Sequence, residues 1–128
     1  MSEAKTEVPR NILGSKEAFA AVSVLKERTL YVDALDATVR IRALSYEARS
    51  AIEASNVGDD GKILPAKLMT AGARYVAAAV VDDNGALIFD DDIEAVGRMP
   101  TDAVEQIYAA VQDLSGMTRK ALEDIEGN

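Results

Sequence analysis

The segment of residues 102–115 constrains the fold more than any other because its helical period is clear. Its apolar residues recur every three or four positions: Val104, Ile107, Tyr108, Val111 and Leu114. The opposite face is polar, and Gly116 follows as a stop signal. A helix with a single apolar stripe must bury it against a second layer. This segment therefore predicts a helix that lies on a core built by other elements.

Two earlier runs have the composition and the period of β-strands. Residues 29–32 read TLYV, and in residues 38–42 Val39 and Ile41 alternate with Thr38, Arg40 and Arg42. A period of two is typical of a strand with one buried face. Residues 33–37 between the two runs form a connection short enough for a hairpin. The sequence thus predicts a small N-terminal β-hairpin.

Further helices are predicted before and after this hairpin. Ser15 and Ser45 have the position and chemistry of N-caps for helices at residues 16–22 and 46–55. Pro65 fits the first turn of a longer helix, since its missing N–H costs nothing there. The stripe of that helix consists of Leu68, Gly72, Tyr75, Val76 and Ala79. Small residues at positions 71–73 would let another backbone approach it closely.

The dipeptide Asn84-Gly85 is the sharpest turn signal, because both positions tolerate positive φ. Residues 80–81 and 86–89 could pair across it as a second short hairpin. Residues 90–92 are all aspartate and suit the N-terminus of a helix, where carboxylates meet the positive end of the helix dipole. Gly97 would end that short helix.

These elements predict an α+β fold that is mostly α-helical. It consists of a small N-terminal β-hairpin followed by a helical domain, with the second short hairpin inside it. The 128 residues fit one domain. We expect residues 1–14 to form a flexible N-terminal segment and residues 15–128 to form a single domain.

The composition disfavours catalysis. The chain has no cysteine, which excludes disulfides, thiolate metal sites and cysteine nucleophiles. It also has no histidine, the commonest general base and the commonest metal ligand. A Gly-x-Ser-x-Gly elbow and a glycine-rich phosphate loop are both missing from the sequence. We expect no enzymatic activity, no catalytic residues and no cofactor.

A calcium loop is tested by aligning Gly85 with the glycine of an EF-hand, and the alignment fails. It puts Val80 at the first ligand position and Asp91 in place of the last, bidentate glutamate. We therefore expect no metal. A looser divalent site remains an open alternative, among Asp82, Asp83, Asp90, Asp91 and Asp92.

The net charge of -8 is concentrated in the C-terminal half, where residues 75–128 hold 3 basic and 12 acidic side chains. Such a surface repels phosphate, so we expect no nucleic-acid partner. No apolar run approaches the roughly 20 residues of a membrane span, so we expect no membrane partner either. The first ten residues do not resemble a signal peptide, and a reducing cytoplasm is the expected setting.

The order of features along the chain resembles the tail assembly chaperones of siphophages, across about residues 15–126. A short helix leads into the hairpin, a second helix follows directly, and an alanine-rich helix runs into the turn and an acidic helix start. The sequence runs that carry the resemblance are VRIRAL at 39–44, SYEAR at 45–49, VVDDNG at 80–85, LIF at 87–89, MP at 99–100 and SG at 115–116.

This resemblance implies a function in the cytoplasm of the host bacterium. Proteins of this family coat the helical tape-measure protein, keep it soluble and recruit major tail (tube) protein subunits, and they are absent from the mature virion. Self-association is a further expectation. The family typically also makes a longer product by programmed frameshifting. The last three residues, Glu126-Gly127-Asn128, can be encoded GAG-GGA-AAC, which contains the slippery heptamer G-GGA-AAC.

Partner contacts are expected in the C-terminal part, and the candidates are Val96, Met99, Ile107, Leu114 and Met117. The alternative for each is a place in the core. Two other functions stay open. One is a structural virion component, such as a head–tail connection or tail-terminator protein. The other is an acidic regulatory protein that mimics nucleic acid and blocks a basic partner.

Overall fold

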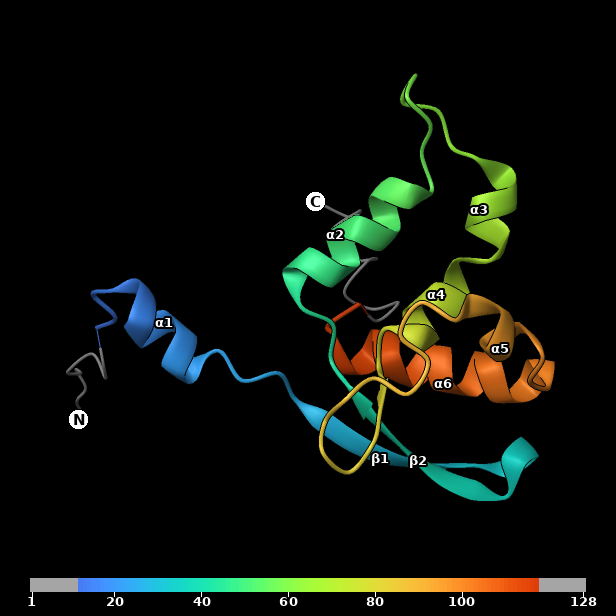
Figure 1. The fold of residues 1–128 in the computed structure, drawn as a ribbon, viewed down its shortest axis with the longest axis horizontal. Helices are drawn as coiled ribbons and strands as arrows, with labels where there is room; N and C mark the ends of the chain where they lie inside the picture. The colour runs from blue at the N-terminus through green and yellow to red at the C-terminus, as the bar shows by residue number, and fades with distance from the viewer. Residues whose placement is uncertain (1–11, 118–128) are drawn as a thin grey trace, which may run out of the picture.

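A computed structural model describes residues 12–117 as a three-stranded antiparallel sheet with helices packed on one face (Figure 1). The strands are β1 (Glu27–Val32), β2 (Ala37–Arg42) and β3 (Val80–Val81), in the order β1-β2-β3. Helices account for more of the chain than strands do. The predicted α+β, mostly α-helical fold is confirmed.

The N-terminal hairpin is confirmed as β1 and β2, which pair with Thr29 opposite Arg40. The two strands are joined by the 3-10 turn η1 (Asp33–Leu35) and by Asp36, whose φ of 49° is left-handed. The Tyr31 hydroxyl donates a hydrogen bond of 2.5 Å to Oδ1 of Asp36. Alternation along the strands turns Val32 and Ile41 towards the helices, where both are fully buried.

The second hairpin exists only as a turn closed by one bridge. Residues Val80 and Val81 pair with β2, and Val81 forms a single bridge with Leu87. Gly85 has a φ of 82°, but Asn84 does not have the positive φ that the sequence predicted. Oδ1 of Asp82 instead accepts the N–H groups of Asn84 at 2.8 Å and Ala86 at 3.0 Å. The result is a three-residue loop with a left-handed glycine at its end.

The helix starts follow the predicted capping. Ser15 caps α1 (Lys16–Val22), and Ser45 caps α2 (Tyr46–Ser55). In each case the serine Oγ accepts the N–H three residues later, from Ala18 at 3.1 Å and from Ala48 at 3.0 Å. Asp92 caps α5 (Ile93–Gly97) in the same way. The last helix, α6 (Thr101–Leu114), begins after Pro100 and ends before Gly116, whose φ is 75°.

The prediction of one long helix from Pro65 is wrong. The structure has two helices, α3 (Pro65–Met69) and α4 (Ala71–Ala77), which meet at Thr70. The Thr70 hydroxyl donates to the Lys67 carbonyl at 3.1 Å, and Arg74 donates to the same carbonyl at 2.7 Å. These side chains satisfy the end of α3, so the helical ladder is not continued.

The core lies between the sheet and the helices α4, α5 and α6. Its largest fully buried side chains are Val32, Ile41, Val76, Val81, Val96, Ile107 and Val111. Alanines at positions 77, 79 and 103 have no exposed surface and bring the layers close together. A smaller cluster joins α2 and α4 to the end of α6 through Ile52, Ala71, Tyr75 and Met117.

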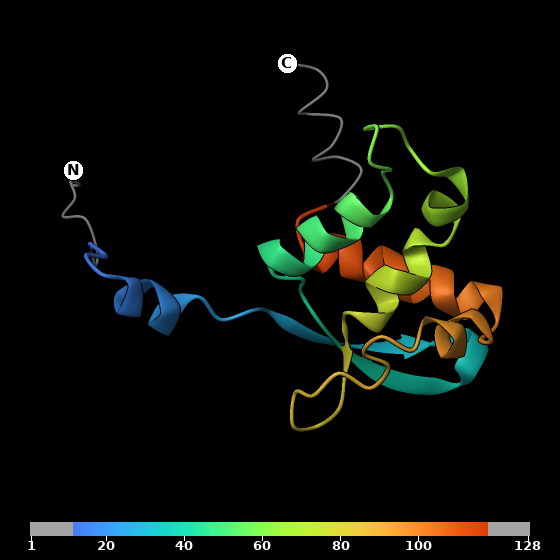
Figure 2. The same cartoon turned by 45° about the horizontal axis from the view of Figure 1, so that its top comes forward.

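Helix α1 stands clear of this body in both views (Figure 2). None of its residues is buried, and within residues 12–117 no other element packs extensively against it. The expected flexible segment of residues 1–14 lies almost wholly outside the described residues, as does the end of the chain from residue 118.

Candidate functional site

An apolar groove of about 480 Å³ lies between the α3–α4 pair and the α5–α6 pair. Its lining comes mainly from apolar and small residues: Leu68, Met69, Ala71, Gly72, Ala73, Val96, Gly97, Met99, Val104 and Tyr108. Thr70, Thr101 and Glu105 are its polar members. Because α3 and α4 meet at an angle at Thr70, α3 projects beyond the core and forms one wall (Figure 1).

The rim on α3 exposes two large apolar side chains. Met69 is 85% exposed and its neighbour Leu68 is 52% exposed. Apolar side chains gathered at a concave surface mark interaction sites more often than isolated ones do. Methionine also adapts to partners of varied shape, since it is unbranched and polarizable.

The floor of the groove depends on a glycine. A methyl group placed on Gly72 would lie 3.3 Å from Cδ2 of Tyr108, so the Tyr108 ring occupies the space of a larger side chain. The ring of Tyr108 stacks on that of Tyr75 at 5.3 Å and 29°. Burial raises the pKa of both phenols above the ordinary value. The Tyr108 side chain that lines the groove is therefore uncharged at neutral pH.

The two walls differ in charge. Glu105 lines the groove on α6, and Asp102 lies one turn away on the same exposed side. Arg98, the basic side chain at the end of α5, is paired with Glu94 at 3.7 Å. The opposite wall is formed by Leu68 and Met69 of α3 and has no acidic residue. A basic group on the occupant would therefore be attracted to the α6 wall.

The structure brings only part of the predicted contact set to this groove. Val96 and Met99 line it, but Val96 is fully buried and only Met99 offers exposed surface. Ile107 and Met117 are buried in the two core clusters, and Leu114 packs against the first cluster at the far end of α6. A substitution such as Met117→Glu would thus test core packing and not partner binding.

Sequence reasoning missed the two rim residues, Leu68 and Met69. Leu68 was assigned to the stripe of one long helix, which would have turned it towards the core. Its exposure results from the break at Thr70. The available signal was Thr70 itself, a β-branched residue with a hydroxyl that can bond to the preceding turn.

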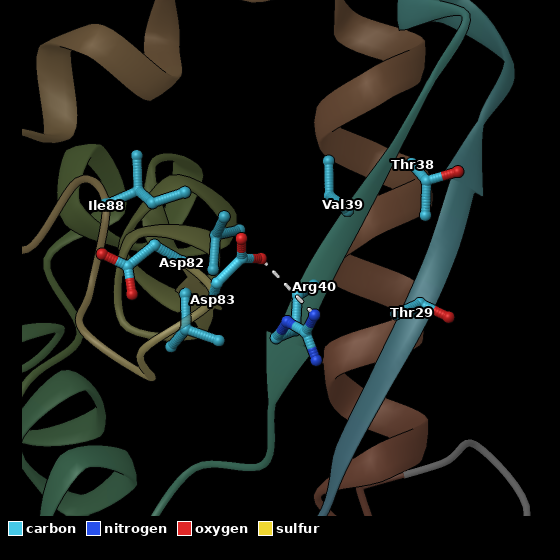
Figure 3. A pocket seen from close by; sticks show the side chains of 9 residues that line it. Thr29, Thr38, Val39, Arg40, Asp82, Asp83 and Ile88 are labelled. Atoms are coloured by element: carbon cyan, nitrogen blue, oxygen red, sulfur yellow. Dashed lines mark ion pairs between the residues drawn. The ribbon is translucent and has the colours of Figure 1, made fainter.

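A second hollow, of about 380 Å³, lies beside the sheet and is lined by both polar and apolar residues (Figure 3). Arg40 on β2 projects into it between Thr29 on β1 and the loop that carries Asp83. The guanidinium is 3.5 Å from Asp83 and 3.9 Å from Glu27. Since carboxylates already flank Arg40 on two sides, the hollow has little attraction for an anionic ligand.

Among residues 12–117, no group of three or more acidic side chains comes together as a metal site, and the five aspartates of residues 82–92 do not form one. No helix in this range has the length and apolar character needed to cross a membrane.

No protein family model matches the chain, and no curated protein or solved structure is significantly similar to it. The groove and the charges around it are therefore the features from which a function can be proposed.

Proposed function

We propose that this protein is a tail assembly chaperone of a bacteriophage, and that it holds an apolar helical stripe of the tape-measure protein in the groove between α3–α4 and α5–α6. The observation that carries the proposal is the groove itself, with Leu68 and Met69 exposed at its rim. The resemblance noted in the sequence supplies the identity of the client.

The groove has the properties that a helical client requires. Helices bind in grooves through apolar anchors spaced at i, i+3, i+4 and i+7. This groove is concave, has a volume of about 480 Å³ and is lined mainly by apolar residues. Tape-measure helices expose long apolar stripes before the tail tube encloses them, and uncovered stripes aggregate. The chaperone would cover these stripes and recruit tube subunits as the tail grows.

The test is co-purification of the tape-measure protein with three forms of this chain. The groove variant is Leu68→Ser with Met69→Ser. The matched control is Ile88→Ser with Tyr46→Ser, since these residues are 57% and 86% exposed, against 52% and 85% for the groove pair. Neither double substitution removes a buried side chain, so all three forms should have the same melting temperature.

Wild type and control should retain the client, and the groove variant should bind it more weakly by about 2–4 kcal/mol, because two apolar contacts are lost. Binding should persist at moderate salt, since screening weakens only exposed charge pairs. Equal binding by all three forms would contradict the groove assignment. Abundance of the chain in purified virions would favour a structural virion component, and binding lost at moderate salt would favour the acidic regulator.

A further inference from the structure

Helix α1 carries apolar side chains that no other element of the described residues covers. Phe19 and Val22 on α1 are 57% and 59% exposed, and Val24 in the segment that follows is 80% exposed. An isolated helix of fewer than about 12 residues is marginal in water, and α1 has 7. Its side chains would gain most from a second surface that receives them.

The groove is the surface in the described part of the chain that suits this helix. It is apolar, and no residue of the range 12–117 covers it. The helices α3 and α5, which border it, lie on the opposite side of the body from α1 in both views (Figures 1 and 2). The connecting segment is extended and directs α1 outward. We call α1 the arm. A molecule with the arm on one side and a groove that can receive it on the other can bind further copies head to tail.

The charges of the two surfaces also match. Lys16 is three residues before Phe19 and therefore borders the apolar stripe of α1. Glu17 is on the other side of the helix, away from the stripe. The groove carries its acidic residue, Glu105, on the α6 wall. An apolar stripe with a basic border thus meets an apolar groove with an acidic border.

We infer that α1 of one copy docks in the groove of a second copy, with Phe19 and Val22 against Leu68 and Met69, and with Lys16 beside Glu105. The inference rests on the groove that is assigned above to the client helix. The arm and the groove lie on different sides of the molecule. Each copy that is added therefore leaves one arm and one groove free, and the contact can build linear oligomers. A client helix and the arm compete for the same groove, so client binding shortens these oligomers.

The test uses two variants that each destroy one half of the contact. The arm variant is Phe19→Ser with Val22→Ser, and the groove variant is Leu68→Ser with Met69→Ser. All four residues are exposed, so both variants should fold. Sedimentation velocity over a concentration series should show wild type growing beyond dimers, and each variant alone should associate at least tenfold more weakly.

An equal mixture of the two variants is the decisive sample, because it contains one intact arm type and one intact groove type. It should form heterodimers and nothing larger. Lys16→Glu should weaken association several-fold, and a partner with Glu105→Lys should restore it. A wild type that stays monomeric, an arm variant that still associates, or a mixture without heterodimers would each overturn the inference.

Client binding separates this inference from the proposed function. The arm variant retains an intact groove and should bind the tape-measure protein at least as well as wild type. If that holds while wild type stays monomeric, only the arm contact is wrong. If the groove variant loses self-association but keeps the client, the groove belongs to the arm and the client assignment is wrong.

Discussion

Two glycines show how single residues determine local structure in this chain. Gly85 ends the loop after β3 with a φ of 82°, and its carbonyl accepts a hydrogen bond of 2.8 Å from Arg42. Gly72 has an ordinary helical backbone but faces the ring of Tyr108. The first glycine is required by its backbone conformation and the second by the space around it.

Replacing Gly85 by valine should lower the free energy of unfolding by about 1–3 kcal/mol, because a β-branched residue resists positive φ. The control is Gly14→Val, since Gly14 is exposed and has no atom within 4 Å of an added Cβ. Denaturant titration of both variants measures the difference. Equal stability of Gly85→Val and wild type would show that the loop does not need a left-handed glycine.

Replacing Gly72 by valine should also destabilise the protein by about 1–3 kcal/mol, because the added atoms displace the stacked Tyr108 ring. Gly97→Val is the matched control for stability alone, because Gly97 lies in α5 with open space where its Cβ would be but also lines the groove. The Gly72 variant should in addition lose client binding through its altered groove floor. Thermal melts showing equal effects at both positions would contradict the packing described for Gly72.

Among the elements, those predicted correctly from the sequence carry signals within a few residues of themselves. Ser15 and Ser45 specify two helix starts through hydrogen bonds to residues three positions away. Alternation in residues 38–42 specifies β2. The elements that were predicted wrongly depend on residues far away in the sequence. Val80 and Val81 pair with β2, about 40 positions earlier, and that pairing cannot be read from the local pattern of residues 80–89.

The groove could not be predicted because it depends on the break at Thr70. Thr70 is a signal for that break, but the sequence does not show that Arg74 would join Thr70 in satisfying the end of α3. Without the break, Leu68 and Met69 would continue the line of α4. The sequence pattern also predicts Ile107 and Met117 as partner contacts, although both are buried in the core. An apolar stripe in a sequence does not show whether the core or a partner covers it.

The two serine caps should differ in their effect on global stability. Ser45→Ala should cost about 0.5–2 kcal/mol, because α2 packs on the body through Ile52 and Tyr75. Ser15→Ala should leave the global transition unchanged, since α1 contributes no buried residue. Chemical denaturation measures both. A comparable loss in the two variants would mean that α1 is part of the cooperative unit.

The whole molecule combines a small, tightly packed body with uncovered apolar surface on two sides. The sheet and the helices α4, α5 and α6 form the body, with alanines and valines at its centre. The groove and the arm α1 remain outside that core. A protein built in this way is suited to bind other helices.

The soluble fraction of the tape-measure protein during co-expression tests the central claim most directly. With the wild-type chain or with Ile88→Ser/Tyr46→Ser, most of the tape-measure protein should stay in the supernatant after centrifugation. With Leu68→Ser/Met69→Ser it should move to the pellet, although that variant itself remains folded and soluble. A tape-measure protein that pellets with every form, or stays soluble with every form, would contradict a chaperone that acts through this groove.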